Sequence, residues 1–150
     1  MLLSIISGTW NRIEYLKDMV VSARKSMPPN WKGGEDYEFV ITDGGSTDGT
    51  LEWMELQSDI RIIRHTELLG AIKAFNDAGA EAKGDYLIPA NDDIAFNGLS
   101  IAKGLAFMMD HPEAGAGCFY QDRGNKAMHV EKMPMMNPDG SSDWLPYIQV

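Results

Sequence analysis

The sequence predicts an α/β protein with a mostly parallel sheet flanked by helices and a small mixed β portion near the C-terminal end. Strand-like apolar runs alternate four times with amphipathic helical patterns before residue 110, which is typical of a parallel sheet. A chain of 150 residues also has the usual length of one domain. We therefore expect a single domain over residues 1–150, with its core in about residues 1–120 and the mixed portion in 121–150.

The first strand and helix are predicted by a change in the spacing of apolar residues. Leu2–Ser7 is a largely apolar, isoleucine-rich run, which predicts a buried strand. From Ile13 onward, apolar residues recur every three or four positions, as on one face of an amphipathic helix. Asn11 is the expected N-cap, because its side chain can accept a hydrogen bond from a free helix amide. Two prolines beginning at Pro28 end this helix.

The next two strand–helix units follow the same pattern. Tyr37–Thr42 predicts the second strand, and Ser46 and Thr47 are the expected caps of a short helix after it. Ile60–Arg64 predicts the third strand and Gly70–Ala82 the third helix. The residues expected along one apolar face of that helix are Ile72, Phe75, Gly79 and Ala82.

The fourth unit is clear, and the pattern weakens after it. Tyr86–Pro89 predicts a strand, and roughly Leu99–Asp110 predicts a helix that a His-Pro pair ends. Met133–Asp143 is expected to be a loop, because it is rich in Pro, Asn, Gly and Ser. The further strands expected in this part of the chain are Ala116–Tyr120, Met128–Met133 and Trp144–Val150.

Composition and charge exclude several classes of protein. With 13 basic and 22 acidic side chains the net charge is −9, which repels the phosphates of nucleic acids. The single cysteine, Cys118, excludes an intrachain disulfide and a zinc site of several thiolates. No apolar run reaches the ~18–20 residues of a membrane span, and Met1–Ile6 is shorter than a signal-peptide core of ~7–15 residues. We expect a soluble, cytoplasmic protein.

Polar segments follow three of the predicted strands. Thr9–Arg12 comes after the first strand, Asp43 after the second, and Asp92 with Asp93 after the fourth. Right-handed crossovers place the carboxyl ends of parallel strands along one edge, where ligands of such sheets bind. We therefore expect these side chains to meet in one crevice.

Asp92 and Asp93 are adjacent carboxylates, and like charges at close range repel unless a cation or hydrogen-bond donors lie between them. Mg²⁺ and Mn²⁺ prefer oxygen ligands, and Mg²⁺ often binds one or two carboxylates together with phosphates of a substrate. The pair is compatible with a divalent-cation site for a phosphorylated ligand. It is equally compatible with turn and capping residues before the next helix.

The segment Asp43–Thr50 reads Asp-Gly-Gly-Ser-Thr-Asp-Gly-Thr. Its glycines permit close backbone approach, and its Ser and Thr side chains can cap a helix. It lacks the closing Glu of an EF-hand, the Gly-Lys-Ser/Thr of a Walker loop and the Gly-x-Gly-x-x-Gly of a dinucleotide fingerprint. Alone, the segment is compatible with a tight strand-to-helix turn that binds no ligand.

Four ordered motifs together resemble family 2 glycosyltransferases. Ile5–Arg12 resembles the family's first strand and its Pro-Thr-Tyr-Asn-Arg loop, and Phe39–Thr50 resembles its second strand and Asp-Asp-Gly-Ser-Thr-Asp-Gly-Thr turn. Gly70–Asn76 and Ala82–Tyr86 resemble its Gly-x-x-x-Ala-x-Asn and Ala-x-Gly-Asp-Tyr segments. Asn91–Asp93 stands where the family carries its Asp-x-Asp-type motif.

The resemblance covers about residues 2–120 and implies a GT-A (Rossmann-like) fold. It implies an inverting transfer of a sugar, with Mn²⁺ or Mg²⁺, from a nucleotide-sugar to a hydroxyl acceptor; a UDP-sugar is the donor we expect. Carried over, Asp43 would accept a hydrogen bond from the base, Asp92 would face the ribose or the metal, and Asp93 would bind the metal. That cation would neutralise charge on the leaving diphosphate.

Other residues are assigned to the nucleotide-sugar by the same resemblance. Arg12 and Lys73 could assist with phosphate charge or remain solvated surface residues. Trp10 replaces the family's Tyr and could stack on the base or pack under its loop. The full set expected around the nucleotide-sugar is Thr9, Trp10, Asn11, Arg12, Asp43, Lys73 and Asp92.

The sequence departs from the family at three further positions. Gly8 stands where the family usually has Pro, and Gly44 replaces the second Asp of the turn. Phe75 occupies a position that is often Arg, which removes a possible phosphate or base contact. None of these changes removes the expected metal carboxylates.

A general base is not identified. Inverting members carry one, commonly Asp or Glu, in an acceptor-binding half beyond the Asp-x-Asp motif. The family's downstream Gly-Gly-Phe and Glu-Asp segments are not recognisable here, so residues 121–150 are expected to be a partial acceptor-side segment of a truncated enzyme. The carboxylates available as weak candidates are Asp122, Glu131, Asp139 and Asp143.

Two alternatives to a glycosyltransferase stay open. The chain could be a module that binds nucleotide without transferring anything by itself. It could also be another nucleotide-handling α/β protein, such as a nucleotidyltransferase. Such a protein would need a basic, Gly-rich, phosphate-binding loop after the first strand. Gly8–Asn11 is a poor match to such a loop.

Overall fold

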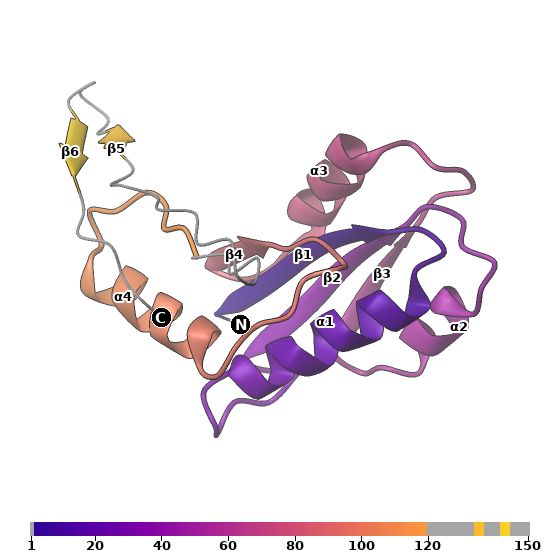
Figure 1. The fold of residues 1–150 in the computed structure, drawn as a ribbon, viewed down its shortest axis with the longest axis horizontal. Helices are drawn as coiled ribbons and strands as arrows, with labels where there is room; N and C mark the ends of the chain where they lie inside the picture. The colour runs from indigo at the N-terminus through magenta and orange to yellow at the C-terminus, as the bar shows by residue number, and fades with distance from the viewer. Residues whose placement is uncertain (1, 120–133, 137–141, 145–150) are drawn as a thin grey trace, which may run out of the picture. The chain divides into compact units, whose positions relative to one another are not determined.

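The computed structural model describes residues 2–119, 134–136 and 142–144, and the chain divides into two compact units, Met1–Leu105 and Ala106–Val150. The first unit contains a four-stranded sheet in the order β3-β2-β1-β4, in which all neighbours are parallel (Figure 1). The predicted parallel α/β fold is therefore confirmed. The strands are β1 (Leu3–Thr9), β2 (Tyr37–Asp43), β3 (Ile60–Arg64) and β4 (Tyr86–Pro89).

Helices cover both faces of the sheet. One face carries α1, α2 and the first turns of α4, and the opposite face carries α3 (Figure 1). Strands covered on both faces read as nearly continuous apolar runs, which explains the sequences of β1 and β2. The helices are α1 (Ile13–Ser26), α2 (Thr50–Glu55), α3 (Ala71–Glu81) and α4 (Ser100–Asp110).

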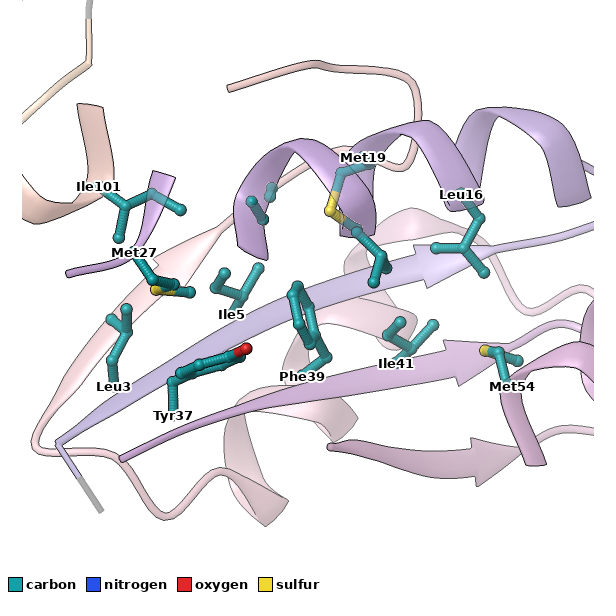
Figure 2. Packing of buried hydrophobic residues seen from close by; sticks show 13 residues of the cluster. Leu3, Ile5, Leu16, Met19, Met27, Tyr37, Phe39, Ile41, Met54 and Ile101 are labelled. Atoms are coloured by element: carbon teal, nitrogen blue, oxygen red, sulfur yellow. The ribbon is translucent and has the colours of Figure 1, made fainter. Parts of the chain in front are cut away.

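The larger core lies between the sheet and α1 (Figure 2). Phe39 at its centre is fully buried, and its ring meets that of Tyr37 edge-on with the centroids 6.0 Å apart. Leu16 and Met19 of α1 are fully buried against the same cluster. Burying one such side chain contributes roughly 1.5–3 kcal/mol, so this face is the main source of stability in the first unit.

The smaller core lies under α3, where Ala78 is fully buried with Ile6 and Val40 of the sheet. Phe75 packs against this cluster, as expected. The prediction for Ile72 is wrong, because its side chain is 81% exposed. Ile72 lies in the first turn of α3, ahead of the stretch from Phe75 to Ala82 that packs against the sheet, so its place along the helix leaves it exposed.

A buried carboxylate holds the start of β4 in place. Glu38 of β2 accepts hydrogen bonds from Ser4 Oγ at 2.9 Å and from the Lys83 amide at 2.8 Å. Its second oxygen accepts a bond from Arg61 Nε at 3.3 Å. Lys83 lies in the connection between α3 and β4, so these bonds fix where β4 enters the sheet. The position of the loop after β4 depends on that entry point.

The carboxylate of Asp48 caps two helices at once. Its Oδ2 accepts a hydrogen bond from the Ile13 amide, at the start of α1, at 3.1 Å. Its Oδ1 accepts bonds from the Thr50 amide at 3.1 Å and from Thr50 Oγ1 at 2.5 Å, at the start of α2. Each helix begins with amides that have no partner inside the helix, and one side chain here satisfies an amide from each.

The caps expected from the sequence are wrong. The N-cap position of α1 belongs to Arg12, and that of α2 belongs to Gly49, with no side-chain bond from either. Asn11, Ser46 and Thr47 instead bond one another across the two loops. For α1 the acceptor, Asp48, lies 35 residues away, which a local pattern of Ser, Thr and Asn cannot show. For α2 the same Asp48, next to the expected Thr47, is the acceptor.

Burial raises the pKa of Asp48, but the hydrogen bonds from Thr50 and Ile13 outweigh that effect and hold the pKa below its ordinary value. The folded protein therefore prefers the ionised carboxylate more than the unfolded chain does. This contribution to stability is present above the unfolded pKa of about 3.9 and is lost as the pH falls through the folded pKa.

β4 is an edge strand of the described sheet. It pairs with β1 alone, in the register Leu3↔Tyr86 to Ile6↔Pro89. Leu87 in this strand is 48% exposed.

Two short strands, β5 (Pro134–Met136) and β6 (Ser142–Trp144), form an antiparallel pair in the second unit. The loop predicted for Met133–Asp143 is therefore wrong at these residues; a strand that begins with Pro is hard to recognise and is confined to sheet edges. Residues 116–119 form no strand, which fits the weak strand propensity of a run that contains Gly117. Tyr120, 128–133 and 145–150 lie outside the described residues.

Within the part of the chain that the structure describes, no helix is both long and apolar enough to cross a membrane.

We expect Asp48→Ala to lower the free energy of unfolding by about 1–2 kcal/mol, because it removes the cap of two helices. Urea unfolding at pH 7 would measure the change, with the exposed α1 residue Asp18→Ala as the matched control. The difference between the wild type and Asp48→Asn should shrink as the pH falls below about 4. An Asp48→Ala variant as stable as the control would contradict the double cap.

Candidate functional site

The carboxyl ends of the strands border a cavity of about 310 Å³ in the first unit. Its walls come from the loops after β1, β2, β3 and β4 and from the start of α3, which confirms that these loops meet at one edge. The lining residues are Gly8, Thr9, Trp10, Arg12, Thr42, Gly44, His65, Leu68, Leu69, Gly70, Ala71, Ala74, Phe75, Asn91, Asp92 and Asp93.

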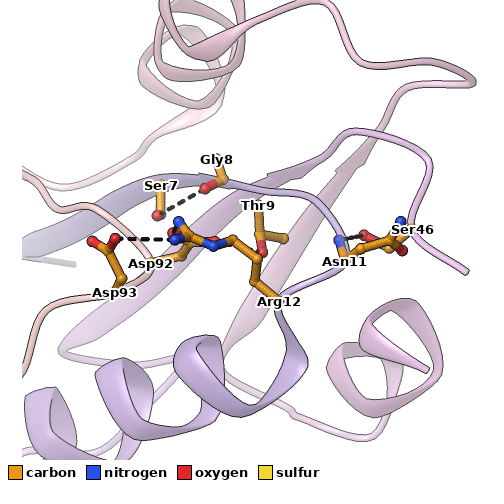
Figure 3. A network of polar contacts seen from close by, with 8 residues as sticks. All are labelled: Ser7, Gly8, Thr9, Asn11, Arg12, Ser46, Asp92 and Asp93. Atoms are coloured by element: carbon orange, nitrogen blue, oxygen red, sulfur yellow. Dashed lines mark hydrogen bonds and ion pairs between the residues drawn. The ribbon is translucent and has the colours of Figure 1, made fainter. Parts of the chain in front are cut away.

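Asp92 joins the loop after β4 to the loop after β1 (Figure 3). It is 4% exposed, and its Oδ2 accepts a hydrogen bond from Thr9 Oγ1 at 2.9 Å. Its Oδ1 accepts one from Arg12 Nη1 at 2.8 Å. Residues that follow β1 and β4 are thus joined directly, as the parallel topology predicts.

Arg12 also reaches the second carboxylate of the pair. Its Nη2 donates to Asp93 Oδ2 at 3.2 Å, so one guanidinium spans both aspartates (Figure 3). The charge of Asp92, and secondarily that of Asp93, raises the pKa of Arg12 above its ordinary value. Arg12 thus pairs with both aspartates while its side chain is 44% exposed, so both roles left open for it, assistance with phosphate charge and a solvated surface position, stay predictions. A guanidinium between two carboxylates relieves the repulsion expected of adjacent like charges.

Asp43 is the last residue of β2, and only one of its two carboxylate oxygens accepts hydrogen bonds. It is 2% exposed, and its Oδ2 accepts hydrogen bonds from the amides of Gly45 at 3.1 Å and Ser46 at 3.0 Å. Its buried Oδ1 has no hydrogen-bond partner among the described residues. A buried acceptor without a donor costs about 1–3 kcal/mol. Asp43 itself is not among the residues that line the cavity, but its chain neighbours Thr42 and Gly44 are, so this free acceptor lies directly behind the cavity wall.

Asn11 and Trp10 occupy different places in the first loop. Asn11 has the left-handed φ of 52°, and its Oδ1 accepts a hydrogen bond from the Thr47 amide at 2.7 Å while its own amide donates to Ser46 Oγ at 2.9 Å. Its side chain thus joins two loops. Trp10 lines the cavity and is 45% exposed, so much of its surface lies open.

Lys73 is not brought to the aspartate pair. Its Nζ lies 2.7 Å from both oxygens of Asp77, one turn further along α3, and it is absent from the cavity lining. The hydrogen bond from Lys73, followed by that from His65, lowers the pKa of Asp77. His65 Nε2 lies 2.8 Å from Asp77 Oδ2 and lines the cavity. Sequence reasoning missed His65, although it directly follows a predicted strand.

The aspartate pair fits a divalent cation in one specific way. Both oxygens of Asp92 already accept hydrogen bonds, whereas the side chain of Asp93 is 39% exposed and uses one oxygen for Arg12. Among the described residues, no group of three or more His, Cys, Asp or Glu side chains is placed to bind a metal. A cation at Asp93 would therefore need the phosphate oxygens of a ligand to complete its coordination, as Mg²⁺ often does.

The candidate general bases stay unplaced. Asp122, Glu131 and Asp139 lie outside the described residues. Asp143 lies in β6 of the second unit, whose position relative to the cavity is not fixed.

Packing explains two of the departures from the family pattern. A Cβ on Gly8 would lie 2.7 Å from the Cβ of Ala74, so α3 can approach β1 here only because the residue is glycine. A Cβ on Gly44 would lie 3.1 Å from Leu68 Cδ1 and 3.4 Å from Trp10 Cβ. These two glycines let the loop after β3, the loop after β1 and α3 close around the cavity.

The sequence model described as Glycosyl transferase family 2 matches residues 4–147. The chain belongs to glycosyl transferase family 2. It is 28% identical over 138 residues to TuaG of Bacillus subtilis (strain 168), named as a glycosyltransferase of teichuronic acid biosynthesis. It is 30% identical over 152 residues to the abequosyltransferase RfbV of Salmonella typhimurium. These matches include 89% and 97% of this chain but only 50% of TuaG and 41% of RfbV.

Solved structures share the fold. The chain matches S. aureus TarS 1-349 in complex with UDP with a TM-score of 0.65 and 24% identity, over 75% of this chain and 33% of that one. It matches the mannosyltransferase PcManGT of Pyrobaculum calidifontis, in complex with GDP-Man and Mn²⁺, with a TM-score of 0.63 and 22% identity, over the same shares. The GT-A fold implied by the sequence motifs is confirmed.

We expect Gly8→Ala to destabilise the protein by about 1–3 kcal/mol, because the new methyl group would collide with Ala74 where α3 crosses β1. Thermal or urea unfolding would measure the loss. Gly79→Ala is the matched control, since its Cβ would make an ordinary 3.7 Å contact with Ile6 and should stabilise α3 by about 0.5–1 kcal/mol. Equal effects of the two substitutions would contradict the close approach at Gly8.

Proposed function

We propose that this chain supplies the donor-binding part of a metal-dependent, inverting glycosyltransferase. It would bind a nucleoside-diphosphate sugar, with UDP as the preferred nucleotide, and the sugar would pass to a hydroxyl acceptor. The observation that carries the proposal is that two carboxylates lie at the same edge of the sheet in a family 2 chain, each with a group that a ligand could use. These are the unpartnered buried oxygen of Asp43 and the half-exposed carboxylate of Asp93.

The proposed role of Asp43 follows from its two unequal oxygens. The amides of Gly45 and Ser46 occupy Oδ2 and fix the plane of the carboxylate. Oδ1 can then accept one hydrogen bond, which suits the single imide N–H of uracil. Cytosine presents a bare ring nitrogen at the corresponding position, and two acceptors facing each other repel. Trp10 and Phe75 line the cavity that Thr42 and Gly44, the chain neighbours of Asp43, also line, and they would supply apolar surface for the base.

The proposed roles of the aspartate pair also differ. Asp93 would bind Mn²⁺ or Mg²⁺ together with the diphosphate, and the bound cation would neutralise charge on the leaving group. Asp92 would set the position of Asp93 and of the ribose, because Thr9 and Arg12 hold its two oxygens. The complexes of structurally similar proteins with UDP, with UDP-GlcNAc, and with GDP-Man and Mn²⁺ support a site of this kind.

A second candidate function is a nucleotide-sugar-binding module that transfers nothing by itself. It is favoured by the share of the relatives that the chain covers, which is only 50% of TuaG and 41% of RfbV, so residues 121–150 would be part of an acceptor-side segment. Sugar transfer or donor hydrolysis by this chain alone would refute this alternative.

We expect binding of UDP to depend on a divalent cation and on Asp93. Isothermal titration calorimetry with Mn²⁺ should show at least about a tenfold loss of UDP affinity in Asp93→Ala or after chelation with EDTA, because the diphosphate charge is then uncompensated. Asp110→Ala, at the exposed end of α4, serves as the control for loss of one carboxylate. Tight UDP binding in EDTA would contradict the metal role of Asp93.

We expect Asp43→Asn to reduce the preference for UDP over CDP by at least about tenfold. The substitution offers the base an amide that can donate as well as accept, so cytosine is no longer rejected. Calorimetry with the two nucleotides, Mn²⁺ being present in both titrations, measures the ratio of the affinities. Thr47→Ser, in the same loop and exposed, is the matched control. An unchanged ratio in Asp43→Asn would show that Asp43 does not contact the base.

A further inference from the structure

The fork of Arg12 contacts one oxygen of Asp92 and one of Asp93, the two carboxylates at which a divalent cation is proposed to bind. Nη1 lies 2.8 Å from Asp92 Oδ1 and Nη2 lies 3.2 Å from Asp93 Oδ2. The guanidinium therefore provides, from within the chain, the positive charge that this carboxylate pair requires. A cation bound at Asp93, whether at Oδ1 or at the Oδ2 that Nη2 contacts, would lie beside this positive charge.

The two arms of the fork differ in strength. The bond to Asp92 has the length usual for a charge-assisted hydrogen bond and lies against a side chain that is 6% exposed. The bond to Asp93 is longer, and the side chain of Asp93 is 39% exposed, so water screens the attraction. A competing cation would therefore break the contact between Nη2 and Asp93 first, while Nη1 keeps its hydrogen bond to Asp92.

The backbone of Arg12 is fixed although the tip of its side chain is not. The neighbouring amides of Asn11 and Ile13 donate to Ser46 Oγ and Asp48 Oδ2, at 2.9 and 3.1 Å. The side chain is 44% exposed, and its Cζ lies 5.2 Å from the centroid of the Tyr15 ring. Contact with an aromatic face stabilises a guanidinium modestly, so Arg12 keeps a favourable environment after it leaves Asp93.

We propose that Arg12 is a built-in competitor of the divalent cation, which prevents tight metal binding until a nucleoside diphosphate is present. The inference rests on the proposed function, because it takes Asp93 as the cation ligand. Without a ligand, the guanidinium halves the negative charge of the pair and repels a second cation beside it. A diphosphate brings negative charge that compensates both cations, so metal and nucleotide bind cooperatively through Arg12.

The test is a titration of the protein with Mn²⁺ alone, in which electron paramagnetic resonance measures the free hexaaqua ion. We expect Arg12→Ala to bind Mn²⁺ about tenfold more tightly than the wild type, since a positive charge within a few ångströms of the ion is removed. Arg12→Lys keeps the charge but loses the fork, and its affinity should fall between the two. Lys25→Ala, at the far end of α1, controls for the change in net charge and should leave the affinity unchanged.

The same titration with saturating UDP completes the test. In the wild type UDP should tighten Mn²⁺ binding by a larger factor than in Arg12→Ala, because the competitor that UDP helps to displace is already absent. Mn²⁺ affinity in Arg12→Ala that is equal to or weaker than that of the wild type overturns the inference. If circular dichroism shows that Arg12→Ala is unfolded, Arg12→Lys decides, and unchanged Mn²⁺ affinity in that variant overturns it.

The two proposals fail in different ways. If UDP with Mn²⁺ does not bind to the wild type but Arg12→Ala binds Mn²⁺ more tightly, the donor site is refuted and the competition stands. If UDP with Mn²⁺ binds to the wild type and Arg12→Ala leaves the affinity for Mn²⁺ alone unchanged, the donor site stands and the competition is refuted.

Discussion

The hydrogen bonds between the loop after β1 and the loop after β2 are the constraint on which the candidate site depends. Asn11 bonds Ser46 and Thr47, and Asp48 bonds the first amide of α1. With both loops held together, Arg12 leaves the backbone at a position from which it reaches the aspartates after β4. The ion pairs of Arg12 with the two aspartates therefore depend on the positions of these two loops. Those positions are held by hydrogen bonds of Asn11, Ser46, Thr47 and Asp48, none of which contacts the aspartate pair.

Much of the fold could be predicted from the sequence, because it depends on local patterns. The change from short apolar runs to a period of 3.6 located each strand and helix of the first unit within one or two residues. The predictions that failed concern partners far away in the sequence. Ile72 belongs to an apolar pattern yet faces outward, and Asn11 resembles a cap yet binds a neighbouring loop. Periodicity does not show where along a helix its contact with the sheet begins.

The sequence predicted which residues lie at the candidate site better than it predicted the hydrogen bonds and ion pairs between them. The topology brought Thr9, Asp92 and Asp93 to one edge, as expected. The fork of Arg12 and the contact of His65 with Asp77 depend on side-chain geometry, which no spacing in the sequence encodes. Asp43 illustrates the same limit: its place after β2 was evident, but the difference between its two oxygens emerges only once the turn is folded.

Among the described residues β4 lies at an edge of the sheet, and this has a consequence for how this chain behaves at high concentration. An edge strand offers unpaired backbone groups to any other strand, which invites self-association. β4 has only four residues and ends in Pro89, which has no amide hydrogen to donate, so a second chain would gain few backbone bonds there. The half-exposed side chain of Leu87 would then supply nonpolar surface for a contact at this edge. Self-association at β4 would therefore be weak and mainly apolar, strengthened by salts that favour burial of nonpolar surface.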